Sequence, residues 1–275
     1  RAAAKSPAPE PELPSPPPPS VAADAPPSSE FVDPLGLPSF LSSYRHPAPV
    51  ARSRHAAWSL REPRRFDFAQ TVHAVLLTLP EIRHAASHYP IVFMSTPPHA
   101  PLALLGIQPG ENFFVDAAGQ WDPEAYIPAY FRRYPFMLES HVVSGESRLC
   151  LDEASEDLSQ GPEHAPLFLD NGDPAPTVQA ALEFCRGFHA MHLNTLEMTR
   201  ALLANGVLTG CAIELKCHQG IFRLSDFLIV NEQALEGLSP LLLDHWRRMG
   251  WLAALYWHIL SLNLWKRLVT LKNRA

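Results

Sequence analysis

Three residues in the second half of the chain have the spacing of metal ligands. Cys185, His189 and His192 are separated by four and three positions, so in a helix their side chains share one face. A thiolate and two imidazoles are ligands that Zn²⁺ accepts. The same positions also belong to the apolar stripe of a predicted helix, where cysteine and histidine often fill interior sites. Because no fourth ligand has a recognisable spacing, buried helix positions are the favoured interpretation, and no metal or other cofactor is predicted.

A pair of arginines offers a second kind of chemistry. Arg132 and Arg133 follow Tyr126 in an aromatic-rich segment, and guanidinium groups bind carboxylates and phosphates. These three residues, with Asp152 and Glu153 on a later loop, are the candidates for binding a ligand. In the alternative, the arginines clamp a loop carboxylate such as Asp152 or Glu153. The structural alternative is favoured because the short helix between two prolines needs anchoring.

The common catalytic signatures do not occur in this sequence. It has no nucleophile elbow, no glycine-rich phosphate loop and no paired-histidine zinc motif. The acidic loop at 152–157 lacks the alternating ligands and the glycine of a calcium loop, so it is interpreted as a solvated loop. No catalytic residue is therefore predicted, and a non-enzymatic function is favoured.

Hydrophobic patterning predicts an α+β fold with an antiparallel β meander first and helices later. Short strands are expected near 72–76, 89–93, 103–106, 113–115 and 149–151, with a helical turn at 80–88 and an aromatic-striped short helix at 126–134. The second half is predicted to contain a long helix at 177–205, a small hairpin at 211–224, a strand at 227–230 and two terminal helices at 240–250 and 251–271.

Proline is concentrated at the start of the chain. Of 29 prolines in 275 residues, 14 lie in the first 50, and such a segment has little apolar surface to bury. We expect residues 1–64 to form a disordered proline-rich arm and linker, and residues 65–275 to form one globular domain.

Charge, cysteine content and hydropathy limit the partners and the location. The net charge of −6 gives no electrostatic reason to bind nucleic acid. The four cysteines form no Cys-x-x-Cys pair, which favours a reducing compartment. The most apolar stretch, Trp251 to Leu264, is shorter than the roughly 20 residues of a membrane-spanning helix, so no transmembrane segment is predicted.

Several blocks of the sequence resemble the SapC family of bacterial proteins in order and spacing. The most specific block runs from Tyr126 to Phe136, and further blocks lie at 89–93, 103–106, 109–112, 150–153, 166–172, 250–252 and 258–262. The resemblance covers about 66–271, so the proline-rich arm lies outside it. The family is named for an association with the bacterial surface layer linked to serum resistance. Its pattern does not require Cys185, His189 or His192.

Two functions follow from these observations. The first is a non-enzymatic accessory or interaction protein, linked by the resemblance to the bacterial surface layer, with a protein partner of unknown identity. The second is a small-molecule or peptide-binding partner of an oxidative enzyme, with a pocket near the helix that carries Arg132 and Arg133. The reduced cysteines favour a cytoplasmic location, and the family resemblance implies the cell surface as the alternative.

Overall fold

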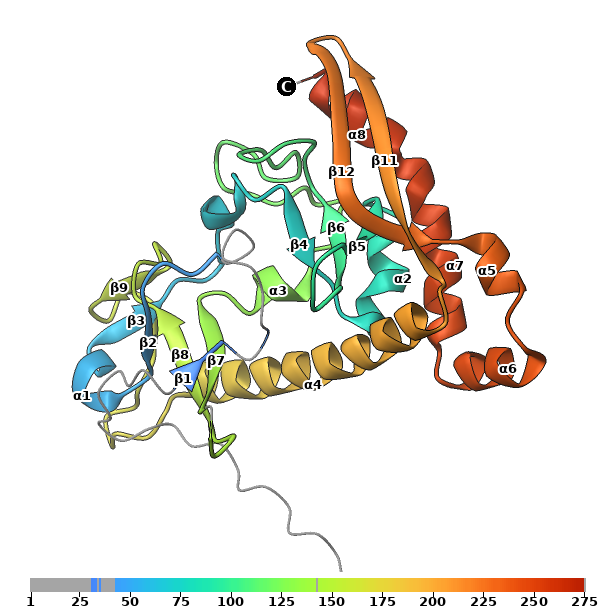
Figure 1. The fold of residues 1–275 in the computed structure, drawn as a ribbon. Helices are drawn as coiled ribbons and strands as arrows, with labels where there is room; N and C mark the ends of the chain where they lie inside the picture. Colours follow the sequence, from blue (N-terminus) through green and yellow to red (C-terminus); the bar gives the residue numbers. More distant parts are fainter. Residues whose placement is uncertain (1–30, 34, 36–42, 142, 275) are drawn as a thin grey trace, which may run out of the picture.

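A five-stranded sheet in the middle of the molecule carries the larger hydrophobic core (Figure 1). The computed structural model describes residues 31–33, 35, 43–141 and 143–274. The strand order is β11-β12-β5-β6-β4, with bounds β4 Ala74–Leu76, β5 Ile91–Met94, β6 Pro101–Leu104, β11 Leu208–Cys217 and β12 Gly220–Val230. All its strand pairings are antiparallel, and helices make up much of the rest, so the α+β prediction is confirmed.

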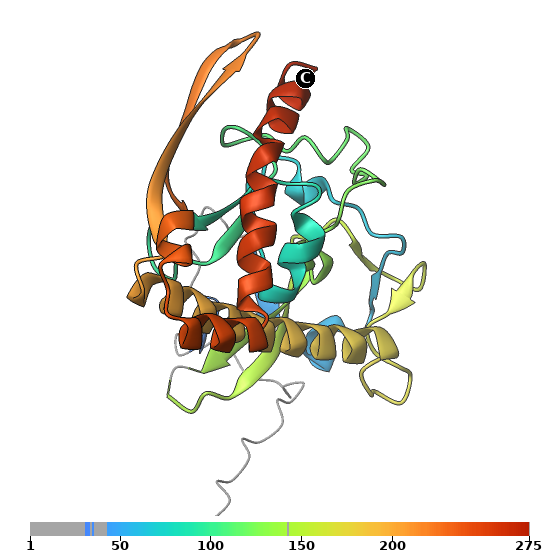
Figure 2. The same ribbon diagram turned by 90° about the vertical axis from the view of Figure 1, so that its right-hand side faces the viewer.

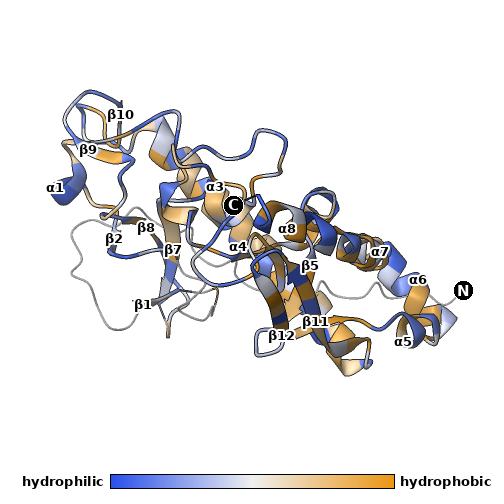
Figure 3. Ribbon diagram, turned by 90° about the horizontal axis from the view of Figure 1, so that it is seen from above, coloured by the Kyte–Doolittle hydropathy of each residue, from blue (hydrophilic) through white to orange (hydrophobic). Residues whose placement is uncertain are grey.

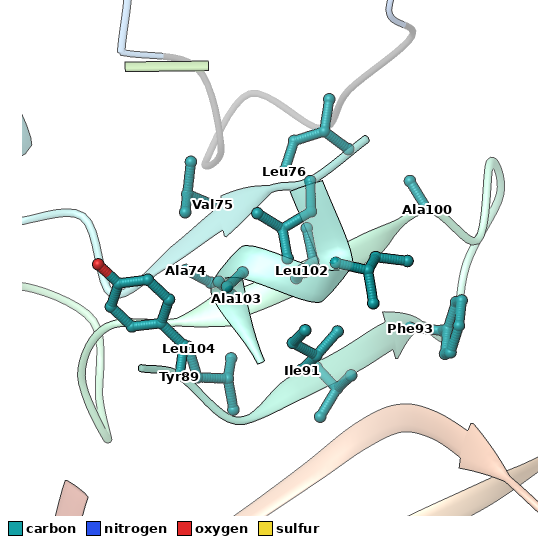
Figure 4. Close-up of a cluster of buried hydrophobic side chains, with 14 of the residues drawn as sticks. Ala74, Val75, Leu76, Tyr89, Ile91, Phe93, Ala100, Leu102, Ala103 and Leu104 are labelled. Carbon is teal, nitrogen blue, oxygen red and sulfur yellow. The ribbon is translucent and has the colours of Figure 1, made fainter. Parts of the chain in front are cut away.

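The three short strands of this sheet are buried along their whole length. Figure 4 shows side chains of all three, including Val75, Ile91 and Leu102, gathered in one cluster. Their sequences are continuous apolar runs because both faces of the strands are covered. The predicted strands here are confirmed. In the sheet β6 lies between β5 and β4, so β4 and β5 are not neighbours. In the sequence, η3 (Leu79–Glu81) and α2 (Ile82–Ala85) separate these two strands. The strand predicted at 113–115 is wrong: this segment makes one isolated bridge, from Val115 to Trp121.

The hairpin of β11 and β12 is longer than the sequence predicted. It projects beyond the rest of the sheet in Figure 1, and its strands carry alternating hydrophilic and hydrophobic bands in Figure 3. The separate strand expected at 227–230 is the second half of β12. Asp226 has a φ of 65°, and the register of the pairing shifts opposite it, between Cys211 and Ile213. This local irregularity interrupts the alternation of apolar and polar residues, but the strand continues through it.

A smaller hydrophobic core lies between two further sheets. One sheet has the order β1-β7-β8-β2 and the other β10-β3-β9. Their bounds are β1 Phe31–Val32, β2 Pro47–Pro49, β3 Trp58–Leu60, β7 Phe136–His141, β8 Ser147–Asp152, β9 Leu158–Gln160 and β10 Ala165–Pro166. The strand near 149–151 is confirmed as β8. Its partner β7, which begins two residues after the end of the predicted aromatic helix, was not predicted.

The folded part of the chain begins earlier than residue 65. Segment 47–60 supplies β2, helix α1 (Arg52–His55) and β3, and its Val50 and Leu60 are both 0 % exposed in the smaller core. β2 pairs with β8 in the four-stranded sheet and β3 pairs with β9 in the three-stranded sheet, so this segment is part of both smaller sheets. Proline content concealed these contacts, since Pro47 and Pro49 lie at the ends of a strand. The arm predicted for residues 1–30 lies outside the described residues.

The long helix α4 (Pro176–Ala204) joins the two cores, and its prediction is confirmed. Figure 1 shows it running beneath both parts of the molecule. Near its start, Val178 packs in the smaller core, whereas Met198 and Leu202 near its end pack in the larger one. The amide of Leu79 donates to Thr195 Oγ1 at 2.8 Å, which fixes η3 against the middle of the helix.

Two of the four C-terminal helices, α7 and α8, lie along one side of the five-stranded sheet, as the rotated view in Figure 2 shows. The four helices are α5 (Glu232–Glu236), α6 (Pro240–Arg248), α7 (Trp251–Ser261) and α8 (Trp265–Lys272). The single last helix predicted at 251–271 is interrupted by a 3₁₀ turn at Leu262–Leu264. Lys272 Nζ forms a 2.5 Å ion pair with Glu111 near the end of α8.

The fully buried His258 ties α7 to the sheet and makes the fold sensitive to acid. The amide of Val230 donates to His258 Nε2 at 3.1 Å, so the ring must stay neutral at this nitrogen. Burial lowers the pKa of His258 from 6.5 to about 4. Between these pH values the unfolded chain binds a proton that the folded chain does not, so stability falls as the pH falls.

We therefore expect His258→Gln to flatten the loss of stability between pH 6.5 and 4, by on the order of 3 kcal/mol. The amide of glutamine does not titrate, and its oxygen can accept from Val230. Urea denaturation at several pH values measures the slope. His218→Gln, at the exposed hairpin tip, is the matched control, and equal slopes in both variants would contradict the prediction.

Candidate functional site

The short helix α3 (Ala129–Arg132) is held in place by one buried carboxylate. Glu81 Oε1 accepts from the Ala129 amide at 2.6 Å and from Tyr126 Oη at 3.1 Å. Its Oε2 accepts from the amide and hydroxyl of Thr78, at 2.9 and 2.7 Å, in a capping box. Glu81 thus joins the start of α3 to the start of η3, and it sets where the two arginines that follow can point.

Arg132 lies on the exposed side of α3 and is bound by local groups. Its Nε donates to the carbonyl of Ile127, and its Nη2 donates to Tyr126 Oη, both at 3.0 Å. The guanidinium lies 5.6 Å from the ring centre of Tyr126 and 5.4 Å from that of Phe184 on α4. Arg132 therefore spans the gap between α3 and α4 without pairing to a carboxylate.

Arg133 is buried and has no counter-charge in contact. It is only 4 % exposed, and its guanidinium lies 4.4, 5.0 and 5.2 Å from the ring centres of Tyr130, Phe188 and Tyr44. Its Nε and Nη2 are enclosed and have no hydrogen-bond partner of good geometry among the described residues, although the Tyr130 hydroxyl lies close to the guanidinium. Asp33 acts on it at longer range, but no carboxylate in the described part of the chain comes within ion-pair distance. A buried charge without a partner costs several kcal/mol, so its position here requires an explanation.

Other buried polar atoms near Arg133 also lack partners. They are Ser43 Oγ, His189 Nδ1, Tyr130 Oη, which lies against Arg133 and the Ser43 backbone without good hydrogen-bond geometry, and the ring nitrogens of His192, which lie in the same way beside the Leu35 backbone; with Arg133 they form what we call the Arg133 cluster. Burial raises the pKa of Tyr130, so this phenol cannot supply a negative charge at neutral pH. Burial also lowers the pKa of His189, and that of His192 to about 4, which keeps both rings neutral. Unpaired polar atoms at this density are typical of a place that a ligand or water completes.

The structure brings together the two sets of candidates that the sequence treated separately. Cys185, His189 and His192 do share one face of α4, and that face adjoins Arg133. Burial raises the pKa of the Cys185 thiol to about 11, so the metal-binding thiolate is disfavoured. A neighbouring guanidinium also repels a cation. Across the described ranges no three His, Cys, Asp or Glu side chains are placed to hold a metal ion.

Asp152 and Glu153 do not join the arginines. Asp152 is fully buried and accepts hydrogen bonds from the amides of Arg45 and His46 and from Tyr134 Oη. Glu153 pairs with Arg54 and His55 of α1. Both predicted interactions are therefore wrong: the two carboxylates neither clamp Arg132 or Arg133 nor line a pocket with them, because they fasten the early segment 45–55, which the sequence assigned to the linker.

Two cavities of about 400 Å³ each lie along the groove between α3 and α4. The basic cavity is lined by Glu62, Arg64, Arg132, Arg133, Pro176, Thr177, Ala180, Ala181 and Phe184. The apolar cavity is lined by Thr78, Pro80, Glu81, His84, Tyr126, Ala129, Arg132, Gly187, Phe188, Met191 and, again, Phe184. Arg132 and Phe184 thus form a wall common to both. The sequence identified Arg132, Arg133 and Tyr126, but it gave no signal for Arg64 or for the early residues of α4.

The relation of the chain to known proteins agrees with this architecture. A family model described as SapC matches residues 50–268. The chain belongs to the SapC family. No curated protein and no solved structure matches it. The family match starts at residue 50, between β2 and α1 of this SapC protein, and so includes α1 and β3 of the early packed segment. In the described part of the SapC chain, no helix combines the length and apolar character needed to cross a membrane.

Glu81 gives a direct test of how the site is built. In Glu81→Gln, one oxygen becomes an NH₂ group that cannot accept, so one pair of donors loses its acceptor in a buried place. We expect the free energy of unfolding to fall by roughly 2–4 kcal/mol, measured by guanidinium denaturation. Glu197→Gln, at an exposed position of α4, should change it by less than about 0.5 kcal/mol. Equal effects of the two substitutions would disprove the role given to Glu81.

Proposed function

We propose that this SapC protein is a non-enzymatic accessory protein that binds a small organic anion in the basic cavity. The observation that carries the proposal is Arg133, a residue of the cavity lining whose guanidinium is buried and whose Nε and Nη2 have no acceptor among the described residues. A bound anion would supply the counter-charge that the described residues do not.

The cavity's charge favours an anion. Its lining includes three arginines, Arg64, Arg132 and Arg133, against one acidic residue, Glu62. Arg64 Nη1 donates to the carbonyls of Arg132 and Tyr134, both at 2.8 Å, which holds this arginine beside α3. Pro176 and Thr177 place the N-terminus of the 29-residue helix α4 in the same wall, where the helix dipole also attracts negative charge.

A carboxylate is the natural chemical match for such a site. Elsewhere in the chain, Arg65 and Arg148 each hold a carboxylate through Nε and Nη2, in pairs with Asp67 and Glu139. The same two nitrogens of Arg133 have no acceptor. Bidentate pairing of this kind combines affinity with a fixed orientation.

The proposal of a non-enzymatic role is supported by the lining of the basic cavity. Thr177 supplies its single hydroxyl group, and no histidine or cysteine borders it. No hydrogen bond in the described part of the chain joins Thr177 to Glu62, the one carboxylate of the lining, so the pairing of nucleophile and general base that covalent catalysis needs is not assembled here. Binding and presentation of the anion are what these groups can do.

Family membership supports a proposal for the partner and the location of the protein. We propose a protein partner associated with the bacterial surface layer, with an oxidative enzyme that receives the anion as the alternative partner, and a cytoplasmic location before assembly. Nucleic acid is not proposed, because the net charge is −6. A pull-down with the full chain should recover an envelope component, and recovery of a cytoplasmic oxidoreductase would favour the alternative.

Arg133→Met tests the binding function. Methionine keeps much of the side-chain volume and removes an unpaired charge, so we expect the stability without added anion to change by less than about 2 kcal/mol. Sodium acetate and phosphate should raise the unfolding temperature of the wild type above an equal ionic strength of chloride, but not that of the variant. Thermal unfolding followed by circular dichroism measures both effects.

A second variant separates binding from folding. Arg64→Gln removes a partly exposed charge at the cavity wall, and we expect it to weaken anion binding three- to tenfold, about 0.7–1.4 kcal/mol, with the fold intact. Arg223→Gln, on β12 and outside both cavities, is the matched control. Wild-type protein that responds to acetate and phosphate no more than to chloride would overturn the proposed function.

A further inference from the structure

The apolar cavity differs from the basic cavity in that the carboxylate and the phenol of its lining already have hydrogen-bond partners. Both oxygens of Glu81 accept hydrogen bonds, and Tyr126 Oη donates to one of them while it accepts from Arg132. The remaining wall is largely carbon, from Pro80, Phe184, Phe188, Met191 and the ring of Tyr126. Arg132 and His84 also belong to the lining, and both lie against the ring of Tyr126, so most of the wall offers the apolar surface that suits an apolar group.

The two cavities follow one another along α4. Residues 176–184 of the helix line the basic cavity and residues 184–191 line the apolar one. Within the second stretch, Phe184, Gly187, Phe188 and Met191 recur at helical spacing and so share one face. At 1.5 Å per residue, the middle of one stretch lies roughly 12 Å from the middle of the other. A single molecule of modest length can therefore occupy both cavities.

Gly187 keeps the apolar cavity open. A Cβ added at this position would meet no heavy atom within 4 Å, so no packing contact requires glycine here. Glycine in the interior of a helix costs about 0.5–1 kcal/mol relative to alanine. Met191, at the same wall, is 39 % exposed although its side chain is apolar. An empty space over glycine beside an exposed apolar side chain is the arrangement that an apolar ligand group would fill.

We propose that the ligand is an amphipathic organic carboxylate whose apolar, ring-sized body lies in the apolar cavity while its carboxylate faces Arg132 and Arg133 in the basic cavity. This inference rests on the proposed anion-binding function and names the class of anion. Aromatic rings of Phe184, Phe188 and Tyr126 favour a flat apolar body. Arg132, on the common wall, lies where the charged and apolar parts of such a molecule meet.

A series of four probes tests the proposal on the full chain by isothermal titration calorimetry. They are acetate, phenylacetate, 4-phenylbutyrate and 4-phenylbutan-1-ol, which vary the apolar body and the charge separately. We expect affinity to rise at least tenfold from acetate to 4-phenylbutyrate, and the uncharged alcohol to bind at least tenfold more weakly than 4-phenylbutyrate.

Filling the apolar cavity should remove the increase in affinity that the apolar body of the ligand gives. Gly187→Leu places a side chain in the open space, so its affinity for 4-phenylbutyrate should drop to within about threefold of its affinity for acetate. Gly187→Ala, which fills little, and Ala190→Leu, at an exposed position of α4 outside both cavities, should behave like the wild type.

The outcomes separate this inference from the proposed function. If acetate and 4-phenylbutyrate bind wild-type protein equally well, or if Gly187→Leu binds both as the wild type does, the apolar cavity takes no part and the inference fails while anion binding stands. If the alcohol binds as tightly as the acid, the carboxylate is not recognised and the inference also fails. If no carboxylate binds, the proposed function itself is wrong.

Discussion

The carboxylate of Glu81 is the contact on which the geometry of the site depends. A four-residue helix has too few internal hydrogen bonds to hold its own position, and α3 is fixed from outside, by the acceptor that Glu81 offers to the Ala129 amide. The same carboxylate closes the cap of η3, which is in turn bound to Thr195 of α4 through Leu79. One buried side chain thus sets α3 relative to α4, and with it the width of the groove between them.

Arg133 illustrates how binding sites and stable cores impose opposite requirements. A core built only for stability would pair this guanidinium or replace it, since desolvation of an isolated charge is unfavourable. The three aromatic rings around it recover part of that cost through cation–π contacts. The rings do not accept hydrogen bonds from Nε and Nη2 of the guanidinium, and His189 and His192, which are neutral, do not add to the positive charge.

Periodicity in the sequence was sufficient for the elements that one pattern governs. The helix α4 and the buried strands β5 and β6 followed from apolar spacing alone. Features that depend on distant partners could not be predicted in this way. The strand β7 was missed, and segment 47–60 was assigned to the linker although it pairs with β8 and β9. In the site, Arg132 and Arg133 could be selected by type. That Cys185, His189 and Arg133 share one neighbourhood follows from the crossing of α3 and α4, which no local pattern encodes.

The shared helix α4 has a consequence for how the molecule can be divided. Its first turns complete the smaller core and its last turns complete the larger one, so neither core is whole without it. A fragment that ends inside α4 would leave an apolar stripe uncovered, and such surfaces associate with other chains. The two cores are therefore not modules that recombination could exchange between proteins. They should be inherited, and lost, as one cooperative unit.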